Sequence, residues 1–428
     1  MTQYGIVALI AAVLTFLLSV LVRRVGLKYR LHPQIRERDV HTTPTPRLGG
    51  VAMFGGMLVA FAIASQIPFF SLVFAQPEKI WALIGAAAII VGMGVADDLL
   101  DLDWMIKLAT QILAAGLLAW QGVAIASLPI GGLTIGSAGM SLVLTVFAVV
   151  FVMNAVNFID GLDGLVAGVA LIANSVFFLY SYLLVQATSP FNYFNLASLL
   201  SAITIGICLG ILPLNSRLGE RRPARLFIGD AGAYLIGLLM ATSAIAVTGQ
   251  VDPIQLGTSF GRASLVPAFL PILLPLAILV IPFLDFALAV TRRLRAGKSP
   301  FTADRKHLHH RLLDMGHSHQ HAVWIFYAWT AVISVGALLF FVVRPWTWAL
   351  LVIGIGLVIC AALTLAPLSR RKAREATAQS TPYAGSTGEA ALDPLDENAD
   401  FVSIETGAID LPRTDPTAAT APSPEENR

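Results

Sequence analysis

The sequence predicts an all-α integral membrane protein, a polytopic bundle of about 11 transmembrane helices. Apolar residues make up 56% of the 428 residues, and charged residues make up only 13%. The mean hydropathy is +0.76. Soluble domains carry about 25% charged residues, so this composition excludes an ordinary soluble fold. Long stretches without Asp, Glu, Lys or Arg recur along the chain, and the loops between them alternate between basic and nearly uncharged.

The candidate spans are the windows free of Asp, Glu, Lys and Arg. They cover 1–22, 48–77, 80–96, 108–159, 164–216, 231–251, 263–284, 322–343 and 345–369. A hydrocarbon core is crossed by about 20 residues in a helix, so the two longest windows hold two spans each. Breaks at 128–132 (LPIGG) and 189–192 (SPFN) divide these two windows.

Individual spans carry further signals. Arg23 and Arg24 follow the first window and no basic residue precedes it, which is the reverse of a secretory signal peptide, so a mature helix is expected. Four prolines in the window 263–284 predict a kinked or broken helix. Glycines and alternation in 121–139 favour a small hairpin. Both cysteines fall inside spans, which excludes an extracytoplasmic disulfide framework.

The basic residues predict the orientation. The loops after the even-numbered spans contain only Lys79, Arg262 and Arg344, whereas the other loops are rich in Lys and Arg. By the positive-inside rule, the amino terminus lies outside and the carboxyl terminus is cytoplasmic. Residues 1–368 then form a multi-pass domain of the plasma membrane. Residues 369–428 form a basic stop followed by a disordered acidic cytoplasmic tail.

With this topology, every acidic or histidine-bearing cluster lies on the cytoplasmic side. The clusters are DDLLD (97–101), NAVNFIDGLDG (154–164), FIGDAG (227–232), HLHH (307–310), Asp285 and HTTPTPRLGG (41–50). A membrane bundle has no structural need to collect its carboxylates on one face. An active site at the inner headgroup plane does have that need.

The DDLLD cluster ends the third span. Asp97 and Asp98 would oppose the partial negative charge of a helix carboxyl end, so a structural role does not explain them. Adjacent carboxylates at a polar boundary suit a hard divalent cation such as Mg²⁺. A solvated loop is the alternative, and for Asp103 we expect only an N-cap of the next span. Lys107 would bind a phosphate or extend to water at the interface.

The NAVNFIDGLDG segment ends the fifth span. Asn154 and Asn157 share a helical face, and Asp160 and Asp163 continue the three-residue spacing across a turn. Paired donors and acceptors of asparagine can recognise a base or sugar. A plain turn or a calcium-binding acidic loop is the alternative, but the ligands of an EF-hand loop are absent.

The FIGDAG segment opens the eighth span. Asp230 near a helix amino terminus is by itself an ordinary cap, but the same helix end favours a bound phosphate. A metal ligand beside a phosphate site would be a coherent pair. Asp285 closes the ninth span and is either functional or paired with Arg292 or Arg293.

The HLHH cluster lies in the loop after the ninth span. A zinc site is the rival interpretation, but the spacing fits no standard structural set and no cysteine is near. Histidine and arginine suit a diphosphate and a sugar, whereas His317, His319 and His321 are expected to be interface residues and not ligands. Together, the clusters predict phosphoryl transfer from a nucleotide to a lipid acceptor. The chain has no P-loop. A secondary transporter is the alternative class, but the spans hold almost no ionisable group.

These motifs carry a family resemblance. Over roughly residues 1–368 the sequence resembles the polyprenyl-phosphate N-acetylhexosamine-1-phosphate transferases, the WecA/MraY group, through DDxxD, NxxNxxDGxDG, FxGDxG and HxHH in that order. HLHHRL is similar to the form in enzymes that use UDP-GlcNAc. The branch that uses UDP-MurNAc-pentapeptide has a triple-histidine pattern and TPTMGG in place of TPTPRLGG. The basic segment RERDVHTTPTPR looks actinobacterial, which favours decaprenyl over undecaprenyl phosphate.

The resemblance implies transfer of GlcNAc-1-phosphate from UDP-GlcNAc to polyprenyl phosphate in the inner leaflet, with release of UMP and a requirement for Mg²⁺ (Mn²⁺ as a substitute). UDP-MurNAc-pentapeptide or another UDP-HexNAc is the alternative donor. No nucleic-acid partner is expected, membrane lipids surround the protein, and a homodimer is compatible with the resemblance.

The residue roles are carried over by motif. Asp97 and Asp98 would be catalytic, and Asp98 and Asp230 would hold the metal. Substrate-binding residues are expected at Lys107, Asn154, Asn157, Asp160, Asp163, Asn215, Phe227, Gly229, His307, His309, His310 and Arg311. Two mechanisms remain open: direct attack by the lipid phosphate, or use of Asp97 or Asp98 as a nucleophile or base.

Overall fold

The computed structural model describes residues 1–31, 45–125, 137–188, 196–216, 223–248, 291, 294–295, 297, 308–343 and 345–380. Within these ranges the secondary structure is helical, with no β-strand, which confirms the all-α prediction. The helices are α1 (Thr2–Lys28), α2 (Gly49–Ala64), the short 3₁₀ helix η1 (Pro68–Phe70), α3 (Pro77–Leu100), α4 (Trp104–Trp120), α5 (Ala138–Phe158), α6 (Leu165–Thr188), α7 (Leu196–Asn215), α8 (Gly229–Thr248), α11 (Leu308–Asp314), α12 (His319–Val342) and α13 (Trp346–Ser380).

Eight of these helices are long and apolar enough to cross a membrane: α1, α3, α5, α6, α7, α8, α12 and α13. Helices α2 and α4 are apolar but shorter. Each of these helices coincides with a predicted span. The ninth predicted span (263–284), Asp285, the tail after residue 380 and most of the expected hairpin lie outside the described residues.

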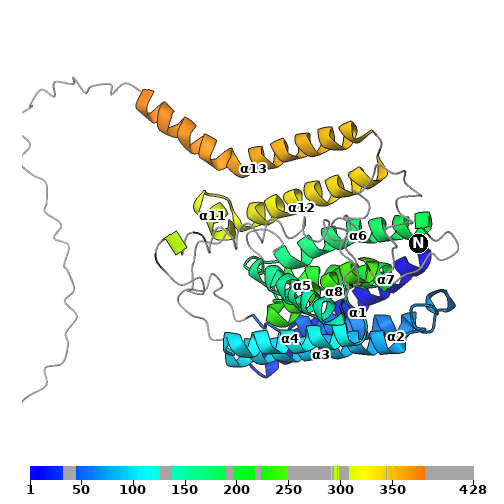
Figure 1. Cartoon of the computed structure of the whole chain (residues 1–428). Coiled ribbons are helices and arrows are strands. Elements are labelled where there is room, and N and C mark those ends of the chain that lie inside the picture. Colours follow the sequence, from blue (N-terminus) through cyan, green and yellow to red (C-terminus); the bar gives the residue numbers. More distant parts are fainter. Residues whose placement is uncertain are drawn as a thin grey trace, which may run out of the picture. The chain divides into compact units, whose positions relative to one another are not determined.

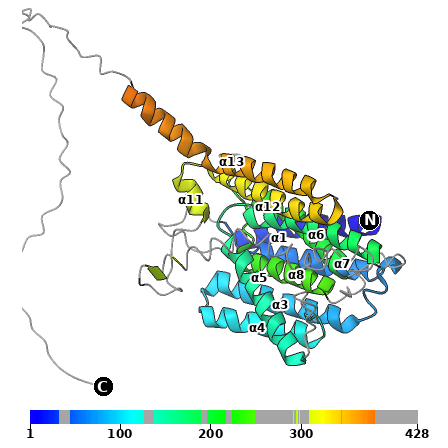
Figure 2. The same ribbon diagram turned by 45° about the horizontal axis from the view of Figure 1, so that its top comes forward.

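The helices of the first structural unit, Met1–Glu375, pack side by side in an order that differs from the sequence. Helices α12 and α13 lie on one side next to α6, and α3 and α4 lie on the other, with α7 and α8 between them (Figures 1 and 2). Helix α8 is the most enclosed span, with 89% of its apolar window buried inside the protein. The amino end of α8, which carries Asp230, therefore lies within the bundle.

Small residues allow the central helices to approach closely. A Cβ atom on Gly94 of α3 would overlap the backbone of Ala231 in α8, and one on Gly206 of α7 would overlap the Ala8 carbonyl of α1. Helices in lipid associate through such contacts, because lipid supplies no hydrophobic driving force between them. The glycines of the apolar spans thus bring α3 and α8 together at the end where both carry aspartates.

Helix ends that are far apart in sequence meet on one face of the bundle. Contacts among residues at the start of α2, the end of α3, the start of α4, the turn after α5 and the start of α8 gather there. The prediction that these clusters share one side is confirmed for the described residues.

The HLHH prediction needs one correction. Residues 308–310 are not in a loop, because they form the first turn of α11. Leu312 of this helix is 2% exposed, and its burial favours an ordered helical turn over a solvated loop. Two of the histidines that follow make contacts with helices: His317 Nε2 lies 3.0 Å from the Thr364 carbonyl within α13, and the Ser318 hydroxyl caps α12 beside His321.

Candidate active site

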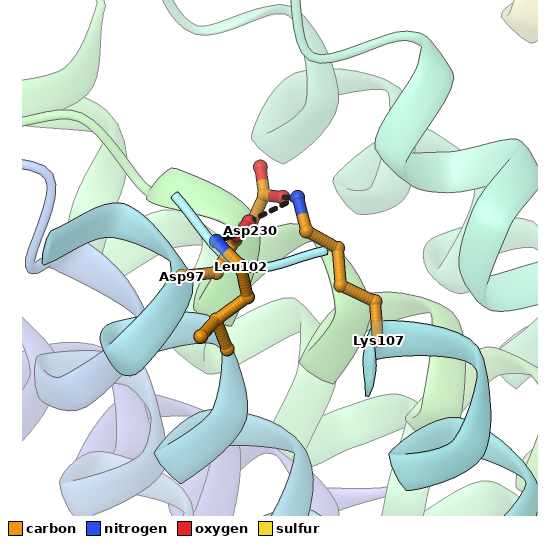
Figure 3. A network of polar contacts seen from close by, with 4 residues as sticks. All are labelled: Asp97, Leu102, Lys107 and Asp230. Carbon is orange, nitrogen blue, oxygen red and sulfur yellow. Dashed lines mark hydrogen bonds and ion pairs between the residues drawn. The ribbon is translucent and has the colours of Figure 1, made fainter. Parts of the chain in front are cut away.

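An ion-pair network joins three helices at the shared face. Lys107 Nζ of α4 lies 2.6 Å from Asp97 Oδ2 of α3 and 3.7 Å from Asp230 Oδ2 of α8 (Figure 3). The Leu102 amide donates to Asp97 Oδ1 over 2.9 Å, so both oxygens of Asp97 are engaged. Only 6% of the Asp97 side chain is exposed. Asp97 is therefore held in one position by the protein itself.

The turn between α3 and α4 produces this network. Asp101 ends α3 in the left-handed region with φ 55°, a conformation that aspartate tolerates better than most residues. The Asp103 side chain then accepts a hydrogen bond from the Met105 amide over 2.8 Å and begins α4. Asp103 is thus an N-cap, as predicted. The tight reversal places Lys107, one turn into α4, against the last turn of α3.

Asp98 has a different environment from its neighbour in sequence. Its Oδ2 atom is buried and has no hydrogen-bond partner among the described residues. The carboxylate lies directly against Gly229, where a Cβ atom would overlap Asp98 Oδ2 and the Arg47 carbonyl. Gly229 also has φ +66°, which an L side chain rarely adopts. The glycine of FIGD therefore makes the space that Asp98 occupies.

Backbone hydrogen bonds join residues 46–50 to residues 227–228 beside the carboxylate cluster. The Phe227 amide donates to the Pro46 carbonyl over 3.0 Å, and the Gly49 amide donates to the Phe227 carbonyl over 2.9 Å. The Gly50 amide donates to the Ile228 carbonyl over 2.9 Å. A Cβ atom on either glycine would overlap the opposing backbone. The RLGG and FIGD motifs are consequently joined by backbone hydrogen bonds, and Phe227 contributes its main-chain amide and carbonyl to them.

The two asparagines of α5 are not equivalent. The Asn154 amide donates to Gln111 Oε1 over 2.6 Å and to the Val150 carbonyl over 2.8 Å, so both its hydrogens link protein groups. Asn157 Nδ2 is buried and forms no hydrogen bond with a described residue. It lies close enough to Asp230 to interact with its carboxylate. Asn157 thus retains a donor that faces the cluster.

Asp160 lies in the turn after α5, at the mouth of the cluster. Its side chain retains contact with solvent. Desolvation by the surrounding protein, together with the charges of Asp230 and Asp163, raises the pKa of Asp160 above its ordinary value, and Arg47 opposes this shift. The turn thus adds a fourth carboxyl group to a site that already holds three aspartates.

Asp163 lies on the wall of a second space. Its Oδ2 atom accepts a hydrogen bond from the Ala224 amide over 3.2 Å. It also lines a cavity of about 640 Å³ between α6, α7 and α12, which includes Ser216, His319 and Trp324. Tyr327 on the same wall donates to the Gly164 carbonyl over 2.6 Å. Asp163 thus joins the loop before FIGD to the α5–α6 turn.

The remaining predicted residues are placed as follows. Asn215 is 4% exposed and donates to the Leu226 carbonyl over 3.1 Å, so it anchors the segment that leads into FIGD. Arg311 is exposed on α11. His307 lies outside the described residues, and for His309 and His310 only the helical backbone is described.

Three residues near the cluster were absent from the predicted set. Arg47 is a positive charge that acts on Asp98 and Asp160. Gln111 is 1% exposed and accepts from Asn154. Tyr234 lies one turn beyond Asp230 and interacts with Gln111. The TPTPRLGG motif could have indicated Arg47, whereas Gln111 and Tyr234 lie within apolar windows and carry no sequence signal.

The donor chemistry of the cluster fits a magnesium ion shared with a substrate. Within the described ranges, no group of three Asp, Glu, His or Cys side chains is arranged to hold a metal. Mg²⁺ is usually held by one or two carboxylates, water and substrate phosphates, not by an all-protein cage. The buried, unpartnered Asp98 Oδ2 would suit one such ligand position, and Asp230, on the adjoining element, would suit the second.

The chain is similar to a known family and to several known proteins. A family model described as glycosyl transferase family 4 matches residues 80–248. The chain is 36% identical over 373 residues to the decaprenyl-phosphate N-acetylglucosaminephosphotransferase of Mycobacterium tuberculosis, covering 86% of this chain and 90% of that protein. It is 30% identical over 337 residues to the probable undecaprenyl-phosphate N-acetylglucosaminyl 1-phosphate transferase of Bacillus subtilis, covering 78% and 84%. It is 28% identical over 329 residues to the undecaprenyl-phosphate alpha-N-acetylglucosaminyl 1-phosphate transferase of Escherichia coli O157:H7, covering 74% and 78%.

Proposed function

This chain belongs to the polyprenyl-phosphate N-acetylglucosamine-1-phosphate transferases of glycosyl transferase family 4, and we propose that it transfers GlcNAc-1-phosphate from UDP-GlcNAc to a polyprenyl phosphate. The products are polyprenyl-diphospho-GlcNAc and UMP. The observation that carries the proposal is the convergence of the DDLLD and FIGD aspartates on Lys107 at one end of the bundle. Decaprenyl phosphate is the acceptor to test first, because it appears in the names of the mycobacterial relatives.

The proposed orientation places this site at the cytoplasmic headgroup plane of the plasma membrane. The support is the distribution of Lys and Arg among the loops. A site at that depth meets a soluble nucleotide sugar from one side and a lipid phosphate from the other. Both substrates are anions, so the main obstacle to reaction is bringing their phosphates together.

The chain's own residues address that obstacle by position and charge. Lys107, held between Asp97 and Asp230, is directed at the centre of the cluster. Asp97 is a positioning residue in this account, because both its oxygens already bind protein groups. Asp98 and Asp230 would hold Mg²⁺. When bound, the ion neutralises charge on the diphosphate and on the departing phosphate.

We propose direct attack as the chemical step. An oxygen of the lipid phosphate bonds to the β-phosphorus of UDP-GlcNAc, and the bond from that phosphorus to the bridging oxygen breaks, so UMP departs with the bridging oxygen. The second pKa of a phosphate monoester is about 6, so the acceptor is already mostly a dianion at neutral pH. A general base therefore has little to remove.

One assay tests the reaction and the donor. Purified protein, Mg²⁺ and decaprenyl phosphate are combined with UDP-GlcNAc, UDP-MurNAc-pentapeptide or UDP-GalNAc, and UMP release is measured. UMP release only with UDP-GlcNAc is expected. Release with the pentapeptide donor alone, or with none, would refute the proposal.

A second assay separates the two mechanisms. Labelled UMP is incubated with UDP-GlcNAc in the absence of any lipid acceptor. Direct attack predicts no label in UDP-GlcNAc, because no enzyme-bound intermediate exists to be reversed. Appearance of label would establish a covalent intermediate on the protein.

A further inference from the structure

Arg47 is held beside the carboxylate cluster by its backbone. The carbonyl of Pro46, the preceding residue, accepts a hydrogen bond from the Phe227 amide. The Gly49 amide, two residues after Arg47, donates to the Phe227 carbonyl. Pro46 and Leu48 are buried on either side. The Arg47 carbonyl itself lies against Gly229, the residue that also contacts Asp98. The main chain at Arg47 is therefore fixed relative to both Asp98 and Asp230.

The side chain of Arg47 has no such restraint. It is exposed, and it makes no ion pair or side-chain hydrogen bond with another described residue. Because its backbone adjoins Gly229, which also contacts Asp98, the charge of Arg47 acts on Asp98 and Asp160. Lys107, by contrast, is already ion-paired with Asp97 and lies 3.7 Å from Asp230.

The Arg47 guanidinium is available to a ligand, because no described side chain holds it. Exposed ion pairs contribute only about 0–1 kcal/mol, so pairing would gain little, yet the local negative charge still attracts the guanidinium. The planar fork of guanidinium matches a phosphate in a bidentate arrangement, and its charge is permanent. A site built from aspartates that must accept two phosphorylated substrates needs such a cation at its rim.

We propose that the Arg47 guanidinium is a phosphate-binding group, which clamps a phosphate of one reacting substrate over the Asp98–Gly229 contact. This inference rests on the proposed function, since that reaction supplies the two sources of phosphate: the diphosphate of the nucleotide donor and the monoester of the lipid acceptor. The ligand chemistry is the same for both, and kinetics distinguishes them.

The test compares Arg47→Ala, Arg47→Lys and the control Arg24→Ala. Arg24 is exposed near the cytoplasmic end of α1, so its replacement removes the same charge from the same surface without touching the cluster. UMP release is measured as a function of UDP-GlcNAc at saturating decaprenyl phosphate, and then with the roles of the two substrates exchanged. Thermal unfolding in detergent checks that each variant is folded.

For Arg47→Ala, the KM of the substrate whose phosphate is clamped should rise roughly 10- to 100-fold, the loss expected for a charged hydrogen-bonding pair. A rise confined to UDP-GlcNAc assigns the clamp to the donor diphosphate, and a rise confined to decaprenyl phosphate assigns it to the acceptor. Arg47→Lys keeps the charge but loses the fork, so it should recover part of the affinity. Arg24→Ala should behave as the wild type.

Unchanged KM values for both substrates in Arg47→Ala would overturn the inference, as would a fall in kcat alone together with a lowered unfolding temperature. If Arg47→Ala fails to fold, Arg47→Lys and Arg47→Gln are compared by the same measurement. If the wild type releases no UMP, the proposed function fails. The clamp is then judged by titrating UDP, and separately decaprenyl phosphate, into wild type and Arg47→Ala. If the two proteins bind UDP with equal affinity and also bind decaprenyl phosphate with equal affinity, the inference is refuted.

Discussion

Lys107 Nζ lies 2.6 Å from Asp97 Oδ2 and ties the first turn of α4 to the last turn of α3. The adjacent Asp98 has no such partner among the described residues and leaves Oδ2 buried and unbonded. Two consecutive aspartates with the same sequence signature therefore occupy opposite electrostatic environments. One is neutralised by the protein, and the other is left for a ligand.

If Asp97 acts through Lys107, their substitutions should not be independent. Asp97→Ala and Lys107→Ala should each lower kcat/KM by roughly 10- to 100-fold, and the double variant should lose little more than the worse single variant. The reason is that either change disrupts the same ion pair, and contacting residues couple by about 0.5–3 kcal/mol. UMP release measures all three variants. Multiplicative losses would instead assign Asp97 a chemical role of its own.

Asp98→Asn should separate stability from activity. Replacing the charge should lower kcat by roughly 1,000-fold or more, since a preorganised electrostatic group is lost. In the presence of EDTA the unfolding temperature should rise, because a buried carboxylate without a partner costs about 1–3 kcal/mol. Asp101→Asn is the control for unfolding, since Asp101 is exposed and asparagine tolerates its positive φ. A lower unfolding temperature for Asp98→Asn would contradict this account.

Two glycines of α3 form a matched pair. A Cβ atom at Gly94 would overlap the backbone of Ala231, next to Asp230, whereas a Cβ atom at Gly92 would meet nothing within 4 Å. Gly94→Ala should therefore destabilise the protein by about 1–3 kcal/mol through overpacking and reduce turnover by displacing Asp230. Gly92→Ala should be neutral or slightly stabilising. Both variants are measured by thermal unfolding and UMP release. If Gly94→Ala were as stable and as active as Gly92→Ala, the close α3–α8 contact would be unimportant.

The metal site predicts a defined response to chelation. EDTA should abolish UMP release, and Mg²⁺, or Mn²⁺ as a substitute, should restore it. Asp230→Asn should abolish turnover at ordinary Mg²⁺ or raise the concentration needed for half-maximal activity by about 10-fold or more, while the protein stays folded. Near-normal rates in Asp230→Asn would remove this residue from the metal site.

The two ends of α4 test the orientation. In intact cells, a membrane-impermeant maleimide should label Gln121→Cys, and it should label Asp103→Cys only after permeabilisation. Both native cysteines, Cys208 and Cys360, are buried, so background labelling should be low. Labelling of Asp103→Cys from outside would reverse the proposed topology and remove the site from the cytoplasmic face.

Much of the site's composition followed from residue order. Each apolar span reverses the direction of the chain, so the DDLLD, NAVNFIDGLDG and FIGDAG motifs had to end on one face, and Lys107 of the following span with them. Asp103 as an N-cap could be predicted too, because capping is a local property of the residues around it. The HLHH segment was harder, because a seven-residue helix such as α11 depends on burial of Leu312 more than on propensity.

The sequence by itself therefore determined which side chains share a membrane face, since span length and charge-free windows depend only on chain order and bilayer thickness. Only the tertiary structure decided which of them meet. In the folded protein Lys107 pairs with Asp97 and not with Asp98, and Asn154 donates a hydrogen bond to Gln111. The Arg47 carbonyl lies beside Gly229. The physical reason is that these contacts join residues up to about two hundred positions apart, and interhelical packing sets their distances, which no local pattern encodes.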